Sequence, residues 1–313
     1  MRSAARKLPS WIGPLVALLV VYALFAVLAP DTFLRGANTA SMAQRTVVVA
    51  VCSLGMTMVI ATGGIDLATG SLVALTTVLV AKLLTKGVSP AVACLLAVGA
   101  ATTLGAFVGL VIGRFKMLPF VVTLGSMSML RGLAKGIASE QKIDCDPRGI
   151  DRLVAATHVV SPSLWASLAL AIVVGVVLTG TRFGRHVFAV GSNEATARLV
   201  GINTARVKVL VYAASSLLAG VAGIFEFATL TVGDPTDAIG LELKVIAAVV
   251  IGGGSLSGGE GSVVGALLGA LLMTVIETGG VHLGMPGWVQ EIVAGAIIVL
   301  AVALDRARAQ RAA

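Results

Sequence analysis

The chain has 313 residues, of which 57% are hydrophobic and only 12% are charged. A soluble globular domain carries roughly 25% charged residues, so this composition excludes a protein whose surface mainly faces water. The net charge of +8 would indicate nucleic-acid binding in a soluble protein, but Lys and Arg also gather in the short cytoplasmic loops of membrane proteins. We therefore expect lipid, and no nucleic acid, around this chain.

Ten apolar runs predict an all-α polytopic bundle of about ten transmembrane helices, with residues 1–313 as a single membrane domain. A crossing helix needs about 20 residues. The approximate spans are 11–29, 46–63, 70–85, 91–113, 118–137, 163–180, 208–229, 243–253, 262–281 and 288–304. The first run follows a basic N-terminus, as in a signal peptide, but it is long for one and no clear cleavage site follows, so we expect it to remain.

The eighth run, 243–253, is too short to cross a membrane alone. We expect this span either to begin nearer Ile239 or to continue through the glycine-rich segment that follows it.

The distribution of positive charge predicts that both termini are cytoplasmic. Ten spans place both ends on one side, and the segments on that side hold 13 of the 23 Lys and Arg residues with few acids, Glu194, Glu260 and Asp305 among them. The 13 basic residues are Arg2, Arg6, Lys7, Arg114, Lys116, Arg182, Arg185, Arg198, Arg206, Lys208, Arg306, Arg308 and Arg311. Eight or twelve spans would give the same parity, so the charges support an even number more firmly than ten.

Two polar segments interrupt the apolar runs. Residues 139–162 form a predicted periplasmic loop, and residues 181–208 a basic cytoplasmic loop. In the second, GSNEATARLVGI predicts a short helix, with Ser192 or Asn193 as N-cap, Glu194 in the first turn and Gly201 after the last turn. Such a helix fits a groove on a cytosolic partner, although a plain surface helix in a long loop has the same pattern.

Two glycine-rich breaks contain the other motifs. In GGIDLATGS, Asp66 is an ionisable residue at membrane depth, which marks a functional candidate, or it caps the next helix or lies at the interface. Ser71 is placed to satisfy freed backbone groups. The second break, GGGSLSGGEGS from Gly252, lacks the Lys-Ser or Lys-Thr pair of a phosphate-binding P-loop. The chain therefore shows no ATPase site of its own.

The two breaks also resemble each other. VIATGGIDLATGSLVAL (from Val59) and VIGGGSLSGGEGSVVGAL (from Val250) each place a glycine-rich break between one span and the next. Transporters often contain duplicated halves whose interrupted helices meet near the pathway, but glycine-rich apolar segments also match by chance.

Several ionisable side chains fall within the expected spans. Arg131, Glu226 and Glu277 would each line an aqueous cavity, pair inside the bundle or lie near an interface. His158, His186 and His282 lie in loops or at span ends, and the three cysteines have no metal-ligand spacing. We therefore expect no catalytic set, no metal and no cofactor, which makes a membrane-embedded enzyme improbable.

Five stretches, in order, carry a specific family resemblance. They are GMTMVIATGGIDLATGSLVAL (from Gly55), TLGSMSMLRG (from Thr123), TRFGRHVFAVGSNEATARLVGI (from Thr181), YAASSLLAGVAGIFE (from Tyr212) and LELKVIAAVVIGGGSLSGGEGSVVGALLGA (from Leu241). With them the chain resembles the ribose/xylose-type permeases of bacterial ABC importers, over nearly its whole length from Pro30 onward.

The resemblance implies the fold of vitamin B12-type importers, a bacterial inner-membrane location and import of a monosaccharide or related sugar. It also implies three partners: separate ABC ATPase subunits, a periplasmic sugar-binding protein, and a second permease copy, identical or a sister chain. The loop helix would be the coupling helix that contacts the ATPase. The implied coupling residues are Asn193, Glu194, Ala195, Arg198 and Gly201.

The resemblance further implies that both glycine-rich breaks lie close to the translocation pathway. Together with the ionisable residues above, the candidate pathway set is Gly64, Asp66, Ser71, Arg131, Gly253 and Ser255. The main alternative is a stand-alone secondary transporter that couples sugar to protons through Asp66, Glu226 or Glu277. Such a transporter would be expected to carry more membrane carboxylates and no docking helix.

Overall fold

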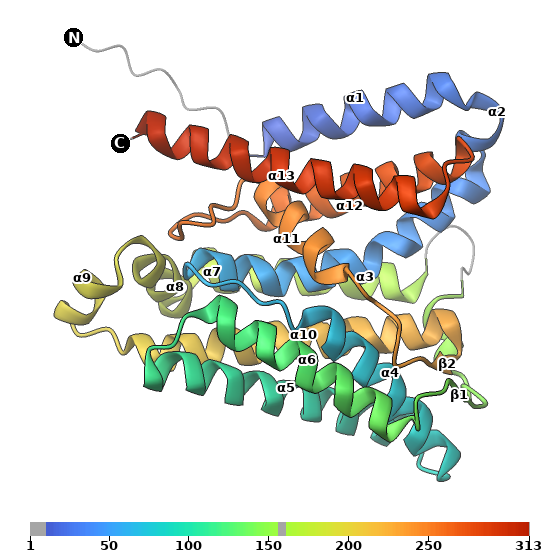
Figure 1. The fold of residues 1–313 in the computed structure, drawn as a ribbon, viewed down its shortest axis with the longest axis horizontal. Helices are drawn as coiled ribbons and strands as arrows, with labels where there is room; N and C mark the ends of the chain where they lie inside the picture. The colour runs from blue at the N-terminus through green and yellow to red at the C-terminus, as the bar shows by residue number, and fades with distance from the viewer. Residues whose placement is uncertain (1–10, 156–160, 313) are drawn as a thin grey trace.

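Figure 1 shows the computed structural model of the protein, which describes residues 11–155 and 161–312, with side chains as far as residue 303. The helices within the predicted spans are α1 (Ile12–Leu28), α3 (Gly36–Ala61), α4 (Thr69–Thr85), α5 (Pro90–Phe115), α6 (Pro119–Ile137), α7 (Pro162–Gly180), α10 (Thr204–Leu230), α11 (Leu241–Ile251), α12 (Val263–His282) and α13 (Gly287–Ala312). The shorter elements are α2 (Pro30–Phe33), α8 (Arg182–Ser192), α9 (Glu194–Leu199), the 3₁₀ helix η1 (Ile150–Leu153) and two strands, β1 (Ile143–Asp144) and β2 (Val232–Gly233).

The predicted all-α bundle is confirmed, since each of the ten apolar runs contains a helix. Among the described residues, α3, α5, α7, α10 and α12 are long and apolar enough to cross a membrane, and α1, α4 and residues 287–303 of α13 are shorter apolar helices. The count of ten crossings stays a prediction. Helix α11 ends after 11 residues and leads into a non-helical glycine-rich segment, which is the second of the two arrangements expected for this run.

Helix α3 lies at the centre of the bundle, packed against α7, α10, α11 and α12. Every residue from Thr46 to Ala61 is buried. The outer helices differ, because α5 exposes Leu95 and Phe107 and α7 exposes Ile172. In a bilayer these apolar side chains face lipid, and the backbone polar groups behind them are satisfied within each helix.

The most extensive helix packing joins α5 to α10, and three glycines of α5 take part in it. Gly105, Gly109 and Gly113 recur at intervals of four and therefore share one face of α5. A β-carbon on Gly109 would lie 2.8 Å from the Cα atom of Val209, and one on Gly113 would lie 2.9 Å from the carbonyl oxygen of Ala205. Only glycine allows the two backbones to approach this closely, as in other membrane helix pairs.

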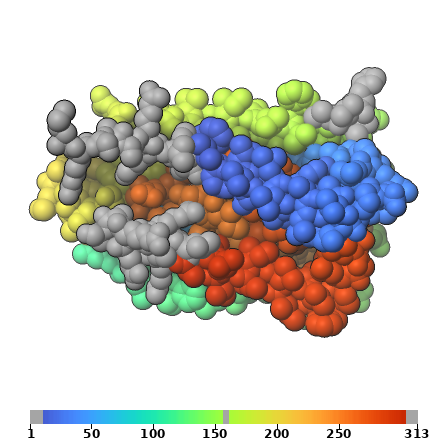
Figure 2. Space-filling view, turned by 90° about the horizontal axis from the view of Figure 1, so that it is seen from above, coloured from blue at the N-terminus to red at the C-terminus, as the bar shows by residue number. Residues whose placement is uncertain are grey.

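Helices α1 and α13 form the outer layer on one face, where part of the α11–α12 region is visible between them (Figure 2). Helix α1 packs on α12, and α13 packs on α11. In Figure 1, α13 ends toward the side that carries α8 and α9. Residues 1–10 and 313, including the predicted cytoplasmic Arg2, Arg6 and Lys7, lie outside the described residues.

The predicted periplasmic segment 139–162 contains two elements that the sequence analysis missed. Strand β1 pairs antiparallel with β2, placing Ile143 opposite Gly233, and a 3.0 Å ion pair joins Lys142 to Asp234. The 3₁₀ helix buries Ile150 against the end of α10. These elements close the end of the bundle opposite α9 (Figure 1). Residues 156–160, with His158, lie outside the described residues.

Candidate functional site

The short helix predicted in the basic loop is α9, and its two ends are fixed by local hydrogen bonds. The Oδ1 atom of Asn193 accepts a hydrogen bond from the backbone N–H of Thr196 at 2.9 Å, so Asn193 is the N-cap. Beyond the helix, Gly201 adopts φ +88° and donates to the carbonyl of Arg198 at 3.0 Å, while Ile202 donates back across the turn. This is the left-handed C-terminal arrangement that favours glycine.

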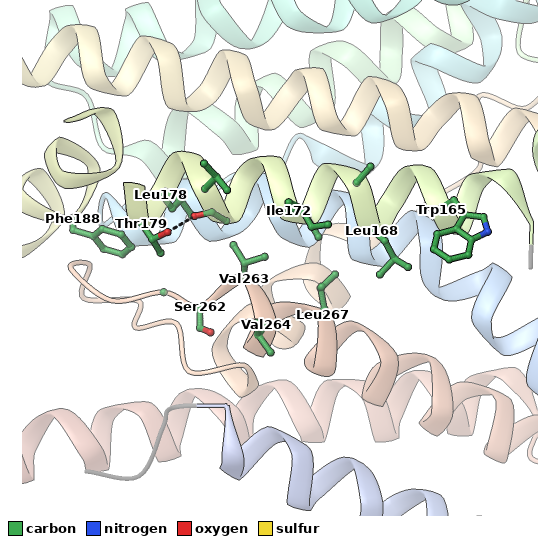
Figure 3. A pocket seen from close by; sticks show the side chains of 15 residues that line it. Trp165, Leu168, Ile172, Leu178, Thr179, Phe188, Ser262, Val263, Val264 and Leu267 are labelled. Carbon is green, nitrogen blue, oxygen red and sulfur yellow. Dashed lines mark hydrogen bonds between the residues drawn. The ribbon is translucent and has the colours of Figure 1, made fainter. Parts of the chain in front are cut away.

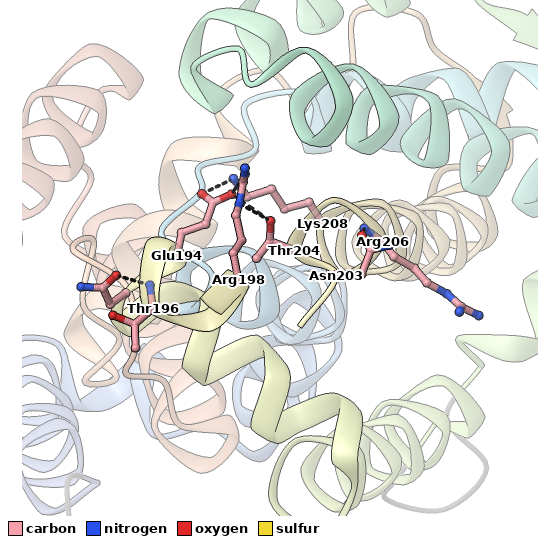
Figure 4. Close-up of polar contacts among 8 residues, drawn as sticks. Glu194, Thr196, Arg198, Asn203, Thr204, Arg206 and Lys208 are labelled. Atoms are coloured by element: carbon pink, nitrogen blue, oxygen red, sulfur yellow. Dashed lines mark hydrogen bonds and ion pairs between the residues drawn. The ribbon is translucent and has the colours of Figure 1, made fainter. Parts of the chain in front are cut away.

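Glu194 joins α9 to the start of α10 (Figure 4). Its Oε2 atom accepts a hydrogen bond from Lys208 at 2.7 Å, and its Oε1 atom accepts one from Arg198 at 2.5 Å and one from the Thr204 hydroxyl at 3.1 Å. Burial of the carboxylate favours its neutral form, but the bonds from Lys208 and Arg198 outweigh that effect and lower the pKa of Glu194 to about 2. Glu194 is therefore ionised at neutral pH, and its hydrogen bonds hold α9 against the start of α10.

The other side of α9 faces outward. Leu199 and Val200 are 87% and 72% exposed, and Ala195 is exposed beside them. These two exposed apolar side chains lie in a basic segment, next to Glu194 and Arg198, which form an ion pair with each other. Of the predicted coupling residues, Asn193, Glu194, Arg198 and Gly201 make the contacts that shape the helix, and Ala195 lies on its exposed face. The set did not include Leu199 and Val200.

The first glycine-rich break follows α3. Gly63 adopts φ +74°, and Gly64 donates to the carbonyl of Val59 at 3.0 Å, which ends the helix in a Schellman motif. Asp66 is only 2% exposed. Its Oδ1 atom accepts from the Ala68 N–H at 2.9 Å, and its Oδ2 atom from the Ser215 hydroxyl at 3.5 Å. Asp66 is thus bonded to the backbone just before α4, close to the capping role expected as one alternative.

Neighbouring helices hold this break in place. The hydroxyls of Thr123 on α6 and Tyr212 on α10 both donate to the carbonyl oxygen of Ile65, at 3.1 and 3.4 Å. A β-carbon on Gly64 would lie 2.6 Å from the Tyr212 hydroxyl oxygen, so this position requires glycine. Ser71 is fully buried in α4, and its hydroxyl has no hydrogen-bond partner among the described residues.

The second break, after α11, repeats the geometry of the first. Gly254 donates to the carbonyl of Val249 at 2.9 Å, and Gly253 adopts φ +92°. In both breaks the last glycine packs against the valine five residues before it. This geometry pairs Val59 with Val249, whereas the sequence resemblance between the two breaks aligned Val59 with Val250. Ser255 is nearly buried beyond this turn.

Both breaks meet the end of α8. A β-carbon on Gly191 would lie 1.8 Å from the carbonyl oxygen of Ala61, at the end of α3, and 2.6 Å from the Gly259 nitrogen, in the second break. Gly259 also donates a hydrogen bond to Ala61 at 3.0 Å. The cytoplasmic-loop motif and the two glycine-rich breaks, which the sequence analysis treated separately, therefore meet at one junction where their backbones are in direct contact. The sequence analysis did not predict α8, and Gly191 was absent from its site set.

Arg131 lies away from this junction. Its Nη1 atom donates to the carbonyl oxygens of Pro235 and Asp237, at 3.0 and 2.6 Å. It therefore anchors the segment between β2 and α11 to α6, instead of projecting free into a cavity.

A polar cavity of about 540 Å³ lies behind that segment, between α3, α10, α11 and α12. Glu226 and Glu277, which the sequence analysis left open, both line it, and Glu277 forms an ion pair with Lys244. Arg45 and Asp237 also line it and were not predicted. The isolation of Glu226 and Glu277 within apolar runs was the only signal for these two residues, and no sequence pattern indicated that the four side chains converge.

A second cavity, of about 820 Å³, is a groove between α7 and α12 (Figure 3). Its lining is mainly apolar and includes Trp165, Ile172, Phe188 and Leu267. Such a surface suits hydrocarbon better than a hydroxyl-rich solute, so the polar cavity is the better candidate for a sugar.

Comparison with known proteins assigns the chain to a family. The family model for the permease component of branched-chain amino acid transport systems matches residues 38–302. The chain belongs to this permease family. No solved structure matches the chain, and its likeness to the vitamin B12-type fold stays a prediction.

Similar proteins cover nearly the full length of this permease. The ribose import permease RbsC of Escherichia coli K12 is 39% identical over 93% of this chain and 92% of its own. RbsC of Bacillus subtilis is 35% identical over 94% and 92%. The L-arabinose ABC transporter permease AraH of Azospirillum brasilense is 31% identical over 95% and 87%. These matches confirm the permease resemblance and favour it over the stand-alone proton-coupled transporter.

Proposed function

We propose that this protein is the transmembrane permease subunit of an ABC-type importer that carries a ribose-like monosaccharide or related sugar across the bacterial inner membrane. The observation that carries the proposal is the match to named sugar import permeases over more than nine-tenths of the chain, 93% for RbsC of Escherichia coli. A separate subunit hydrolyses ATP. This subunit makes and breaks no covalent bond and takes no cofactor.

Helix α9 is the coupling helix in this proposal. Asn193, Glu194, Arg198 and Gly201 position it, through the cap, the carboxylate contacts and the left-handed turn. The exposed side chains of Ala195, Leu199 and Val200 together form the face that enters a groove on the ATPase. Burial of these apolar side chains stabilises the interface in proportion to the apolar area removed from water.

The junction at Gly191 carries the motion of that helix into the bundle. Closure of the ATPase pair on ATP draws the two coupling helices together, and α8 moves with α9. Because Gly191 lies against Ala61 and Gly259, the movement reaches the end of α3 and the segment between α11 and α12 directly. The bundle then changes between inward-facing and outward-facing states.

The translocation pathway in this proposal follows the two breaks. Gly64 and Gly253 allow the turns, Asp66 and Ser71 offer polar groups at membrane depth, and Ser255 follows the second turn. Arg131 acts indirectly, by holding the segment that precedes α11.

The remaining partners are assigned by position. With both termini cytoplasmic, residues 139–162 and the β1–β2 pair face the periplasm and meet the sugar-binding protein. A second permease copy, identical or a sister chain, completes the central pathway, and lipid surrounds the outer helices.

The experiment compares two pairs of substitutions in the assembled transporter. Replacing both Leu199 and Val200 with Ser removes the proposed docking face without touching the Glu194 contacts. We expect co-purification of the ATPase subunit and ATP-dependent ribose uptake to fall at least tenfold. Replacing Trp288 and Val299 with Ser, both exposed on α13, is the matched control and should leave co-purification unchanged.

Two results would overturn this proposal. Undiminished co-purification and uptake in the Leu199/Val200 variant would show that α9 does not dock. Uptake that persists without any ATPase subunit and collapses with a proton uncoupler would instead establish the secondary transporter.

A further inference from the structure

The polar cavity between α3, α10, α11 and α12 differs chemically from the rest of the bundle interior. Gln44 and Arg45 reach it from α3, Glu226 from α10, Asp237 from the segment before α11, Lys244 from α11 and Glu277 from α12. Its volume of about 540 Å³ falls within the range of roughly 300–1,000 Å³ that small-molecule pockets occupy. Charged groups at this depth are costly, and their usual role is to line a solute pathway.

The charges in the cavity nearly cancel. Lys244 pairs with Glu277, and Lys244 and Arg45 are the cations that act on Glu226. The described lining thus presents two cations and three carboxylates. Such a lining offers both hydrogen-bond donors and strong acceptors without a large field of either sign, which suits a neutral ligand rich in hydroxyl groups. A phosphate ester would meet an excess of carboxylates.

One acceptor in this cavity has no N–H or hydroxyl donor beside it. The Oδ2 atom of Asp237 is buried and accepts no hydrogen bond from such a donor among the described residues, and the Asp237 carboxyl group instead meets that of Glu226. A buried polar group without a partner is costly and calls for a ligand or bound water. Arg131 fixes the backbone at this point, since it donates to the Asp237 carbonyl oxygen at 2.6 Å. The Oδ2 atom is therefore held in place at the cavity wall.

The cavity lies near the end of the bundle that carries β1 and β2, away from α9. It is lined by Ser41 near the beginning of α3 and by Thr229 near the end of α10, and α10 leads directly into β2. In the proposed orientation this is the periplasmic end, where a sugar released by the binding protein first meets the permease.

We propose that this cavity is a low-affinity entry site for a neutral, polyhydroxylated sugar, with Asp237 and Glu226 as hydrogen-bond acceptors and Arg45 as donor. The inference rests on the proposed import of a sugar, and it names the site and the chemical class that the site accepts. Balanced charge admits neutral sugars and sugar alcohols and excludes sugar phosphates. Weak binding is required for a transport site, because the solute must also leave it.

Cysteine protection tests this site on the purified permease, without ATPase or binding protein. Gln44→Cys is introduced into a variant in which Cys94 and Cys145 are replaced by Ser, while Cys52 is fully buried and stays. Labelling by a charged thiol reagent is timed with D-ribose, D-xylose, L-arabinose or ribitol present at millimolar concentration, and with ribose 5-phosphate. Asp151→Cys, exposed on η1 outside the cavity, is the matched control.

We expect at least one neutral sugar to slow labelling of Gln44→Cys at least threefold, with no effect on Asp151→Cys and none from ribose 5-phosphate. Adding Asp237→Asn should raise the sugar concentration needed for protection about tenfold, the change that corresponds to replacing a charged hydrogen-bond acceptor by a neutral one.

Absence of protection by all four neutral compounds, or equal protection by the phosphate ester, would overturn the inference. If protection fails while ATP-dependent uptake persists, this site alone is wrong. If protection holds while the docking variant keeps its ATPase, the coupling proposal is wrong instead.

Discussion

The Cα atom of Gly191 faces the carbonyl oxygen of Ala61 so closely that a β-carbon would lie 1.8 Å from that oxygen. Gly191 is the penultimate residue of α8, and Ala61 is the last residue of α3. The contact therefore joins the segment of α8 and α9 to the deeply buried helix α3. The neighbouring residue Ser192 touches Gly259 of the second break. Because backbone packs directly on backbone at both contacts, a movement of α8 has to displace the segments that it touches.

This contact predicts that Gly191→Ala impairs transport more than assembly. The added methyl group has to separate α8 from backbone atoms on two sides, and overpacking of this kind costs about 1–3 kcal/mol. We expect ATP-dependent sugar uptake to fall at least tenfold, while ATPase co-purification stays within twofold because the Leu199 face is unchanged. Gly175→Ala in α7, where a β-carbon meets open space, is the control. Normal uptake by Gly191→Ala would show that the junction tolerates separation.

The α5–α10 contact predicts opposite effects for two glycines of the same helix. A β-carbon on Gly105 would lie 2.6 Å from the Tyr212 carbonyl oxygen, so Gly105→Ala should destabilise the bundle by about 1–3 kcal/mol. Gly99 has open space around it, and Gly99→Ala should stabilise the fold by up to about 1 kcal/mol through better helix propensity. Thermal unfolding in detergent measures both. A stable Gly105→Ala protein would mean that α5 shifts along α10 at little cost.

The carboxylate of Glu194 predicts a pH dependence that is confined to acid. Its pKa is lowered from an ordinary value of 4.5 to about 2. Its contribution to stability is therefore complete above about pH 4.5 and is lost as the pH falls from there toward about 2. Because the side chain is partly exposed, solvent screening leaves a contribution of about 1 kcal/mol.

Hydrogen exchange at the amides of residues 195–200 measures this effect. Protection should be constant from pH 5 to 8, after correction for intrinsic rates, and should decrease below pH 4. Glu194→Gln should show the reduced protection at every pH. A wild-type protein whose protection changes between pH 6 and 8 would contradict the assignment.

The ten helices were predictable because each leaves a local signal. An apolar run between breaks needs only its own residues to be recognised, and the N-cap Asn193 and the turn glycine Gly201 are read from a few neighbours in sequence. Helix α8 was missed although its sequence, RFGRHVFAVGS, carries a helix signal. Phe183, Val187 and Val190 recur at the spacing of one helix face among charged residues, but the segment is short and basic and was interpreted as a loop.

Contacts between distant segments were not predictable in the same way. Gly191 and Ala61 are far apart in sequence, and glycine has no side chain to indicate what it touches. The polar cavity presents the same problem, since Arg45, Glu226 and Glu277 come from three helices and acquire meaning only when those helices pack. The partners of Arg131 were not predictable either, because they are backbone carbonyls that no sequence pattern marks.

Arg131 supports a final prediction that separates anchoring from charge. Its guanidinium donates to the carbonyl oxygens of both Pro235 and Asp237, and a lysine offers a single ammonium point charge in place of that planar fork. Arg131→Ala should release the segment before α11, and Arg131→Lys should restore only part of the anchoring. Lys135→Ala, an exposed change one turn further along α6, is the matched control.

We expect the apparent KM for sugar uptake to rise about tenfold in Arg131→Ala and severalfold in Arg131→Lys, with maximal rate reduced less, because the segment carries a wall of the proposed entry cavity. Hydrogen exchange at residues 237–241 should rise in the same order. If Arg131→Lys matches the wild type in both measurements, positive charge alone suffices and the two carbonyl contacts do not position this wall.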